Sequence, residues 1–308
     1  MTITYHMLTR PQIARTLRAI TLLPVPAQRR IVAALACANS EAGKTRDPKK
    51  VALAAAHFKK REPVIASMHA AIKRQLDYAK FETLRKIEKS ARLKAAAVKS
   101  AEGTRFVSDL VFDPDEFRDG LFATLRSEST DALQLAGDQL FEELGRDEPF
   151  VMADPKALTF LNERENKLAD IPDEIHAEIS DEIKTALDEG STLKQIAQRV
   201  SDKFDQISEG RAANIASTET AAAFGYARQE GMKQAGIATK RWLTSHLPNV
   251  REWHAEAEDD PRNQNVPVDG PFIVGGESLM YPGDGAGSPA NVCNCHCVAV
   301  EGIEEEAA

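Results

Sequence analysis

The chain has 308 residues, of which 43% are hydrophobic and 6% aromatic, and its formal net charge is −8 at pH 7. This length exceeds what one simple core holds, and abundant alanine with few aromatic residues favours packed helices over a large β-sandwich. No stretch approaches the roughly 20 apolar residues that span a bilayer, and the N-terminus lacks the pattern of a secretory signal. We therefore expect a protein made and used in cytoplasm, without membrane contact.

The predicted fold is mainly α, with elongated helical N-terminal and middle regions and a small C-terminal α+β module. The pattern changes after Gly236, where the helical period gives way to short alternating segments, and the α+β module is placed from residue 240. The expected parts are a basic helical arm over 1–103, a helical connector over 104–152, a further helical region over 153–239, a small α+β module with cysteines and histidines over 240–301, and an acidic tail over 302–308.

Charge is distributed unevenly along the chain. Residues 1–100 carry 21 Lys and Arg against 6 Asp and Glu, a net charge of +15, whereas residues 101–308 carry 18 against 41, a net charge of −23. Such asymmetry suggests an arm that approaches an anion, either nucleic acid or an acidic protein surface. The lysines of such helices also often do no more than face solvent. Specific contact with DNA is therefore one of three interpretations, beside an acidic protein surface and a solvated helix face.

The basic arm reads as a series of helices. Residues 9–42 predict two short helices separated by prolines, and Asp47 caps the start of another. The longest predicted helix opens at Pro63 and continues to about Ala101, because no proline or glycine interrupts it. Its apolar residues form a narrow stripe among Lys and Arg, so this helix needs a partner surface on the protein's own body or on another subunit.

The middle of the chain continues as helices with clear start and stop signals. Gly190 stops one helix, Ser191 or Thr192 caps the next, and Gln195 stands where a capping-box partner could reach back. Arg211 and Glu219 lie two helical turns apart, which indicates a structural ion pair or a packing position rather than catalysis. The expected helices begin at Asp113-Pro114, run over 155–169 and 172–189, and end with 208–235, which Gly236 closes.

The C-terminal module reads as short strands and one short helix. Residues 240–244 predict a strand with Trp242 as its core anchor, and residues 249–258 predict a helix. A β-hairpin is expected over 272–281, around a Gly-Gly pair, and another strand over 297–300. Gly283, Gly285 and Gly287 predict a flexible turn, because neither a helix nor a lysine follows as in a phosphate-binding loop. A module of this size gains much stability from a cross-link such as a disulfide or a bound metal ion.

A cysteine-rich segment stands at the end of this module. Residues 282–297 read PGDGAGSPANVCNCHC and hold three of the four cysteines in the chain. Thiols stay reduced in cytoplasm, so this cluster favours a ligand set over a disulfide framework. The remaining cysteine, Cys37, lies in an alanine-rich apolar run and reads as a buried small hydrophobic residue.

The cluster predicts a structural Zn²⁺ site. Thiolate and imidazole are the commonest zinc ligands, and in an extended segment Cys295 and Cys297 point to the same side, where His254 could meet them. Three residues are candidates for a fourth ligand: Cys293, His246 and His296. A core of small thiols, or a disulfide formed after cell lysis, remain the alternatives. If metal binds, we expect it to order the module rather than to catalyse.

The same region carries an ordered set of motifs. These are R-x-x-x-I-A-x-T-E from Arg211 to Glu219, then Gly225, W-x-T from Trp242 to Thr244, V-R-x-x-H from Val250 to His254, and finally YPGD, GSPANV and N-C-x-C up to Cys297. In this order they resemble the phage Mu F-like head morphogenesis family over roughly residues 155–300. The chain departs from the family pattern at Leu247, usually acidic, at Cys293, usually aliphatic, and at His296, commonly arginine.

The resemblance implies a minor head protein of a tailed phage or prophage, a few copies of which join the procapsid near the portal. It implies a structural and assembly role and no enzyme activity, hence no catalytic or cofactor-binding residues. The implied partners are the portal protein and the major capsid or scaffold protein, with phage DNA a further candidate for the basic arm. The implied location is the head interior or portal vertex, after assembly in the host bacterial cytoplasm.

Two rival functions follow from the residues themselves. One is a metal-dependent hydrolase or nuclease in which His254, Glu256 and the cysteines hold a catalytic ion, although no HExxH, Gly-x-Ser-x-Gly or P-loop motif occurs in the chain. The other is a DNA-packaging accessory protein whose basic arm binds DNA with strong salt dependence.

Overall fold

A computed structural model describes residues 47–90 and 102–302 of the chain. The helices expected over 9–42, the residue Cys37 and most of the acidic tail lie outside these ranges. Within them the protein is mostly helical, with long helices and a small C-terminal region of short strands, which confirms the predicted fold class.

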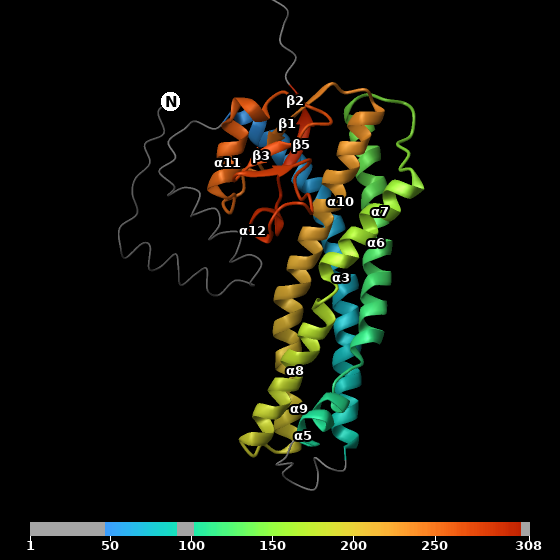
Figure 1. Cartoon of the computed structure of the whole chain (residues 1–308), viewed down its shortest axis with the longest axis vertical. Helices are drawn as coiled ribbons and strands as arrows, with labels where there is room; N and C mark the ends of the chain where they lie inside the picture. Colours follow the sequence, from blue (N-terminus) through green and yellow to red (C-terminus); the bar gives the residue numbers. More distant parts are fainter. Residues whose placement is uncertain (1–46, 91–101, 303–308) are drawn as a thin grey trace, which may run out of the picture.

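Three long helices lie side by side along the long axis of the molecule (Figure 1). They are α3 (Pro48–Lys89), α6 (Pro114–Glu143) and α10 (Ala213–Gln234). Shorter helices cover them: α5 (Glu102–Leu110), α7 (Asp154–Leu168), α8 (Ile171–Asp188) and α9 (Leu193–Ile207). The C-terminal module sits at one end of this helical body.

Helix α3 begins earlier than expected and runs through Pro63. The Asp47 side chain accepts a hydrogen bond from the Lys49 amide at its N-terminus, and the helix continues without a break to Lys89. The predicted start at Pro63 is therefore wrong. Proline removes one main-chain hydrogen bond from a helix interior. Buried residues on both sides of it, Arg61 and Met68, hold the two parts against the same body.

The apolar stripe of α3 packs on the protein's own body. Met68, Ile72 and Ile87 are at most 1% exposed and belong to one core with residues of α6, α8 and α9. A buried apolar stripe contributes most of a helix's stability in a folded protein. The part of α3 from Met68 to Ile87 therefore belongs to this core. The partner surface that the sequence required is thus supplied within the chain.

Helices α9 and α10 form one rod joined by a π-helical turn. Thr192 and Gln195 make the predicted capping box, and the rod then passes through the π turn Ser208–Ala212. Gly210 lies in this turn. The rod ends where predicted, at Gly236 with φ +72°.

The C-terminal module contains two small antiparallel sheets. Strand β1 (Thr239–Leu243) lies between β2 (Val266–Pro267) and β5 (Val298–Glu301), and β3 (Phe272–Val274) pairs with β4 (Glu277–Leu279) as the predicted hairpin. Helices α11 (Glu252–Asp259) and α12 (Pro289–Val292) complete it. Trp242 is 1% exposed and packs edge-on against Phe272, as its predicted role as a core anchor requires.

A close approach of backbones seats this module on α10. A Cβ atom at Gly225 would lie 2.2 Å from the Pro282 carbonyl oxygen, so only glycine leaves room for the loop. Gly283 has φ +87°, and its Cβ position lies 3.0 Å from the Ala221 main chain. The glycine-rich segment is therefore a turn, as predicted, packed against the helix.

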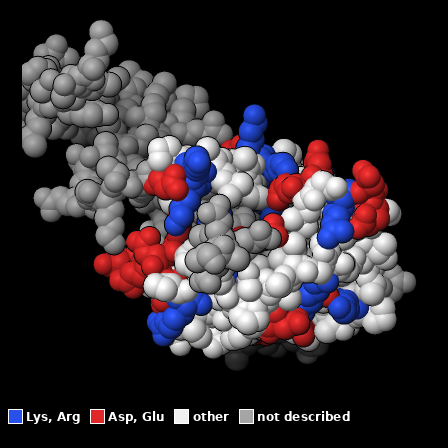
Figure 2. All heavy atoms as spheres, turned by 90° about the horizontal axis from the view of Figure 1, so that it is seen from above, with Lys and Arg blue, Asp and Glu red and all other residues white. Residues whose placement is uncertain are grey.

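Basic and acidic side chains are mixed on the end that carries the module. Seen from this end, Lys and Arg alternate with Asp and Glu in small groups among neutral residues (Figure 2). The described residues on this face therefore make no broad surface of one sign. Among the helices of residues 47–90 and 102–302, none combines the length and the apolar character needed to cross a bilayer.

The close contact at Gly225 yields a test of the interface between helix and module. We expect Gly225→Ala to lower the free energy of unfolding by about 1–3 kcal/mol, because the new methyl group overpacks against the Pro282 carbonyl. The control is Gly210→Ala, where the added Cβ meets no atom within 4 Å. Urea denaturation measures both, and equal stability of the two variants would contradict the packing described.

Candidate metal centre

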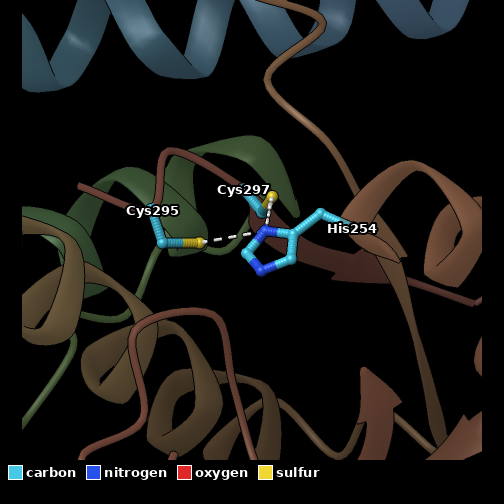
Figure 3. Close-up of side chains that lie close together, drawn as sticks. All are labelled: His254, Cys295 and Cys297. Atoms are coloured by element: carbon cyan, nitrogen blue, oxygen red, sulfur yellow. Dashed lines mark hydrogen bonds between the residues drawn. The ribbon is translucent and has the colours of Figure 1, made fainter. Parts of the chain in front are cut away.

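Three buried side chains converge inside the C-terminal module (Figure 3). The Nδ1 atom of His254, on α11, lies 3.8 Å from the Cys295 sulfur and 3.4 Å from the Cys297 sulfur. All three residues are at most 2% exposed, and their donor atoms lie within 4.8 Å of one another. Within residues 47–90 and 102–302, no other group of three His, Cys, Asp or Glu residues meets this condition. The predicted convergence of His254, Cys295 and Cys297 is present.

The segment that carries the two cysteines is fixed to α10. Asn294 has φ +53°, a left-handed conformation that asparagine tolerates better than most residues. Its amide donates to the Thr218 hydroxyl, and its side-chain amide donates to the Asn214 oxygen. These bonds hold the turn that directs both sulfurs toward His254. Thr218 belongs to the motif that ends at Glu219, and Asn294 begins the N-C-x-C motif. Two motifs that are distant in sequence therefore meet here.

Asn291 sets the tautomer of the His254 ring. Its Nδ2 group donates to the Val274 carbonyl, so its Oδ1 atom must accept. That oxygen lies 2.7 Å from His254 Nε2 and also accepts from the Trp253 indole. The hydrogen atom of the His254 ring therefore lies on Nε2, and the Nδ1 lone pair faces the two sulfurs. Metal-binding histidines typically make such a hydrogen bond through their second nitrogen.

The spacing of the three donor atoms fits a tetrahedral zinc ion. Zn–S distances of about 2.3 Å and Zn–N distances of about 2.0–2.1 Å place nitrogen and sulfur roughly 3.6 Å apart. The two measured separations of 3.4 and 3.8 Å lie on either side of this value. One Nδ1 lone pair can accept a hydrogen bond from one thiol, whereas a cation between the three atoms satisfies all of them. The residues present therefore fit a metal ion.

The pKa values of the two thiols are shifted in opposite directions. A hydrogen bond from the Cys297 thiol lowers the pKa of Cys295 well below its ordinary value. Burial raises the pKa of Cys297 well above its ordinary value, and the neighbouring Cys295 adds to that rise. A divalent ion at the centre would favour two thiolates, because metal ligands must be deprotonated.

A buried arginine from α3 reaches the same segment. Arg61 is 2% exposed and donates from Nη1 to the Cys297 carbonyl over 3.0 Å. Burial lowers its pKa to about 10, so its guanidinium still carries a charge at neutral pH. This contact joins the helical body to the loop of the candidate metal centre.

The three candidates for a fourth ligand lie outside the group of three. Cys293 is half-buried and lines a hollow beside Arg164 on α7. His246 Nε2 lies 3.4 Å from a Glu258 carboxylate oxygen. The ring of His296 packs edge-on against Phe58 at 5.1 Å.

Arg211 and Glu219 do not form an ion pair with each other. Glu219 accepts two hydrogen bonds from Arg164, at 2.8 and 2.6 Å, and this pair is buried. Arg211 instead donates to Glu178 on α8 over 2.7 Å. An eight-residue spacing placed Arg211 and Glu219 two turns apart on one helix, but each has a closer partner on another helix. Glu219 is therefore part of a buried ion pair with Arg164.

Two residues of the centre were not singled out from the sequence. Asn291 lies within the quoted motif GSPANV, so a signal existed, but no role could be assigned to it. Arg61 lies 236 positions from Cys297 and carries no sequence signal toward it.

The fold and the site together describe a helical protein with a small C-terminal module in which one histidine and two cysteines converge. Residues 177–300 match the family model described as Phage Mu protein F like protein, which covers less than half of the 308-residue chain. The predicted resemblance is thereby confirmed, and the match includes every residue of the candidate metal centre except Arg61. No curated protein and no solved structure matches the chain. The matched family is one of structural phage head proteins rather than enzymes.

The role of Asn291 can be tested by truncating its side chain. We expect Asn291→Ala to lower the free energy of unfolding by about 1–3 kcal/mol, because the buried Nε2 donor of His254 loses its acceptor, as does the indole N–H of the more exposed Trp253. The control Asn166→Ala removes an exposed amide on α7, away from the centre, and should change the free energy by no more than about 0.5 kcal/mol. Guanidinium denaturation of the purified variants measures both. Equal effects would show that Asn291 does not organise the centre.

Proposed function

We propose that this protein is a minor head protein of a tailed phage or prophage, with a structural and assembly role in head morphogenesis. The observation that carries the proposal is the family match over residues 177–300. It runs from α8 to β5, the part of the chain that forms the seated module and its candidate metal centre. Under this proposal a few copies join the procapsid near the portal, in the host bacterial cytoplasm, and remain in the head interior or at the portal vertex.

The surface for partner proteins is proposed to lie largely in the N-terminal part of the chain. Within the expected arm of residues 1–103, helix α3 packs its apolar stripe against the protein's own core, so this stripe is not free to bind a partner. Residues 1–46 carry seven Lys or Arg residues and one Glu. We propose that this basic segment contacts an acidic surface of the portal, scaffold or major capsid protein. Phage DNA is the alternative partner, and it predicts affinity that falls steeply with salt.

We further propose that His254, Cys295 and Cys297 hold a structural Zn²⁺ ion. The module contains two sheets of two and three short strands, which alone bury little apolar surface. A bound ion would supply folding energy and hold α11 against the segment before β5. This role fits a head protein, which must keep one shape through assembly.

The rival function as a metal-dependent hydrolase or nuclease finds little support in the site. Glu256, its candidate acidic residue, is exposed, whereas His254 on the same helix is 2% exposed. The hollow beside the three donor atoms measures about 10 Å³. That volume suffices for about one water molecule, and a substrate the size of a peptide or nucleotide does not enter it.

The assembly role can be tested in a phage whose copy of this gene is deleted. We expect the full chain, supplied in trans, to enter heads and restore plaque formation. A chain lacking residues 1–46 should fold, because the described core begins at α3, but should be absent from purified heads by mass spectrometry. A second variant, with the seven basic residues of 1–46 changed to Gln, separates the effect of charge from that of length. Normal infectious heads without any copy of the protein would contradict the proposed function.

The zinc proposal predicts one zinc ion for each purified chain. His254→Ala, Cys295→Ser and Cys297→Ser should each lose most of this zinc and lower the melting temperature, because each removes one donor of a closed set. Cys293→Ser is the matched control, since its thiol lies outside the group, and it should keep the ion. Elemental analysis after dialysis measures the content. A zinc content unchanged in the triple variant would contradict the assignment.

A further inference from the structure

A second hollow, much larger than the one at the metal centre, lies between α3 and the start of α10. It measures about 580 Å³, within the range of roughly 300–1,000 Å³ that is usual for ligand pockets. Its walls include Phe58, Ile65 and His69 of α3, Ser217 of α10 and His296 of the segment before β5. The space between the two helices is therefore large enough for a short stretch of another molecule.

Three residues that line this hollow have buried polar atoms without a hydrogen-bond partner in the described parts of the chain. The atoms are Nε2 of His69, Oγ of Ser217 and Nδ1 of His296. Ser217 is only 8% exposed. His296 also borders the small hollow at the metal centre, whereas His69 and Ser217 do not. Since an unpaired buried polar atom is unfavourable, a ligand that pairs with Ser217 and His69 would be stabilised here.

The lining favours an uncharged ligand that carries both donors and acceptors. A serine hydroxyl and a neutral imidazole can each donate and accept. Among the described residues around the hollow none is Lys or Arg, and Glu62 borders it, so a phosphate or carboxylate group finds no opposite charge there. Phe58 and Ile65 add apolar surface. A polypeptide segment fits these conditions, because each residue other than proline brings one main-chain donor and one acceptor.

We propose that the hollow between α3 and α10 binds a short, uncharged polypeptide segment of another phage head protein. This inference rests on the proposed role in head assembly and names a contact surface for it within the folded body. The main chain of the bound segment pairs with Ser217 and His69, and its side chains pack on Phe58 and Ile65. Nucleic acid is disfavoured as the ligand, because its phosphates would meet Glu62 and no cation.

The first experiment identifies the bound segment with the full chain in phage heads that contain no other copy of the protein. The photoreactive residue p-benzoylphenylalanine replaces Ala66, which is exposed at the hollow, or Lys59, which is exposed beside Phe58. After irradiation, mass spectrometry should find both positions linked to one segment of another head protein. The control position is Asp188, exposed at the end of α8, which should give no link to that segment.

The second experiment measures what the unpaired serine contributes. The linked segment is synthesised as a peptide, and fluorescence anisotropy gives its dissociation constant for the full chain. Ser217→Ala should raise this constant about two- to tenfold, because one neutral hydrogen bond is lost. Ser180→Ala on α8 is the matched control and should leave it unchanged, since Ser180 is 7% exposed, has no partner for its hydroxyl among the described residues and does not line the hollow. Both variants should keep the melting temperature of the unchanged chain.

The outcomes separate this inference from the assembly proposal. A chain that enters heads but links only to itself, to a second copy or to nothing overturns the inference alone. A peptide whose affinity is the same for the unchanged chain and Ser217→Ala, or falls equally in both serine variants, also overturns it. A chain that never enters heads overturns the assembly proposal together with this inference, whereas the zinc proposal depends on neither.

Discussion

The hydrogen bond between Asn291 and His254 is the contact on which the C-terminal site depends. Asn291 donates to the Val274 carbonyl of the hairpin and so must present its oxygen to the histidine. That single requirement places the ring hydrogen on Nε2 and turns the Nδ1 lone pair toward the two sulfurs. With the opposite tautomer, an N–H group would point between the thiols, and the three atoms would not form a ligand set. A hairpin, α12 and α11 are thereby tied to one centre.

Two buried arginines join this centre to the helical body. Arg61 of α3 donates to the Cys297 carbonyl, and Arg228 of α10 donates to the Ala299 carbonyl two residues further on. Burial of a charged group is unfavourable unless it is paired, and Glu143 of α6 supplies the partner of Arg228 over 2.8 Å. The start of β5 is thus held by α3, α6 and α10 together. A metal ion bound at the cysteines would stiffen the same junction between body and module.

Sequence patterns predicted what depends on neighbours along the chain. The capping box at Thr192, the end of α10 at Gly236 and the β3–β4 hairpin follow from local signals, and all three are present. The convergence of His254 with Cys295 and Cys297 followed from alternation along an extended segment. Contacts between distant segments were beyond these rules. Nothing local connects Arg164 to Glu219, or Arg61 to Cys297, and a proline signal at Pro63 was outweighed by the packing of α3 on the body.

The central proposal is that His254, Cys295 and Cys297 are ligands of one metal ion. Anomalous diffraction from crystals of the full chain, recorded on both sides of the zinc absorption edge, tests this claim most directly. The account predicts one strong anomalous peak at bonding distance from His254 Nδ1 and both sulfurs. Density showing a thiol hydrogen-bonded directly to Nδ1, with no anomalous peak among the three atoms, would contradict it.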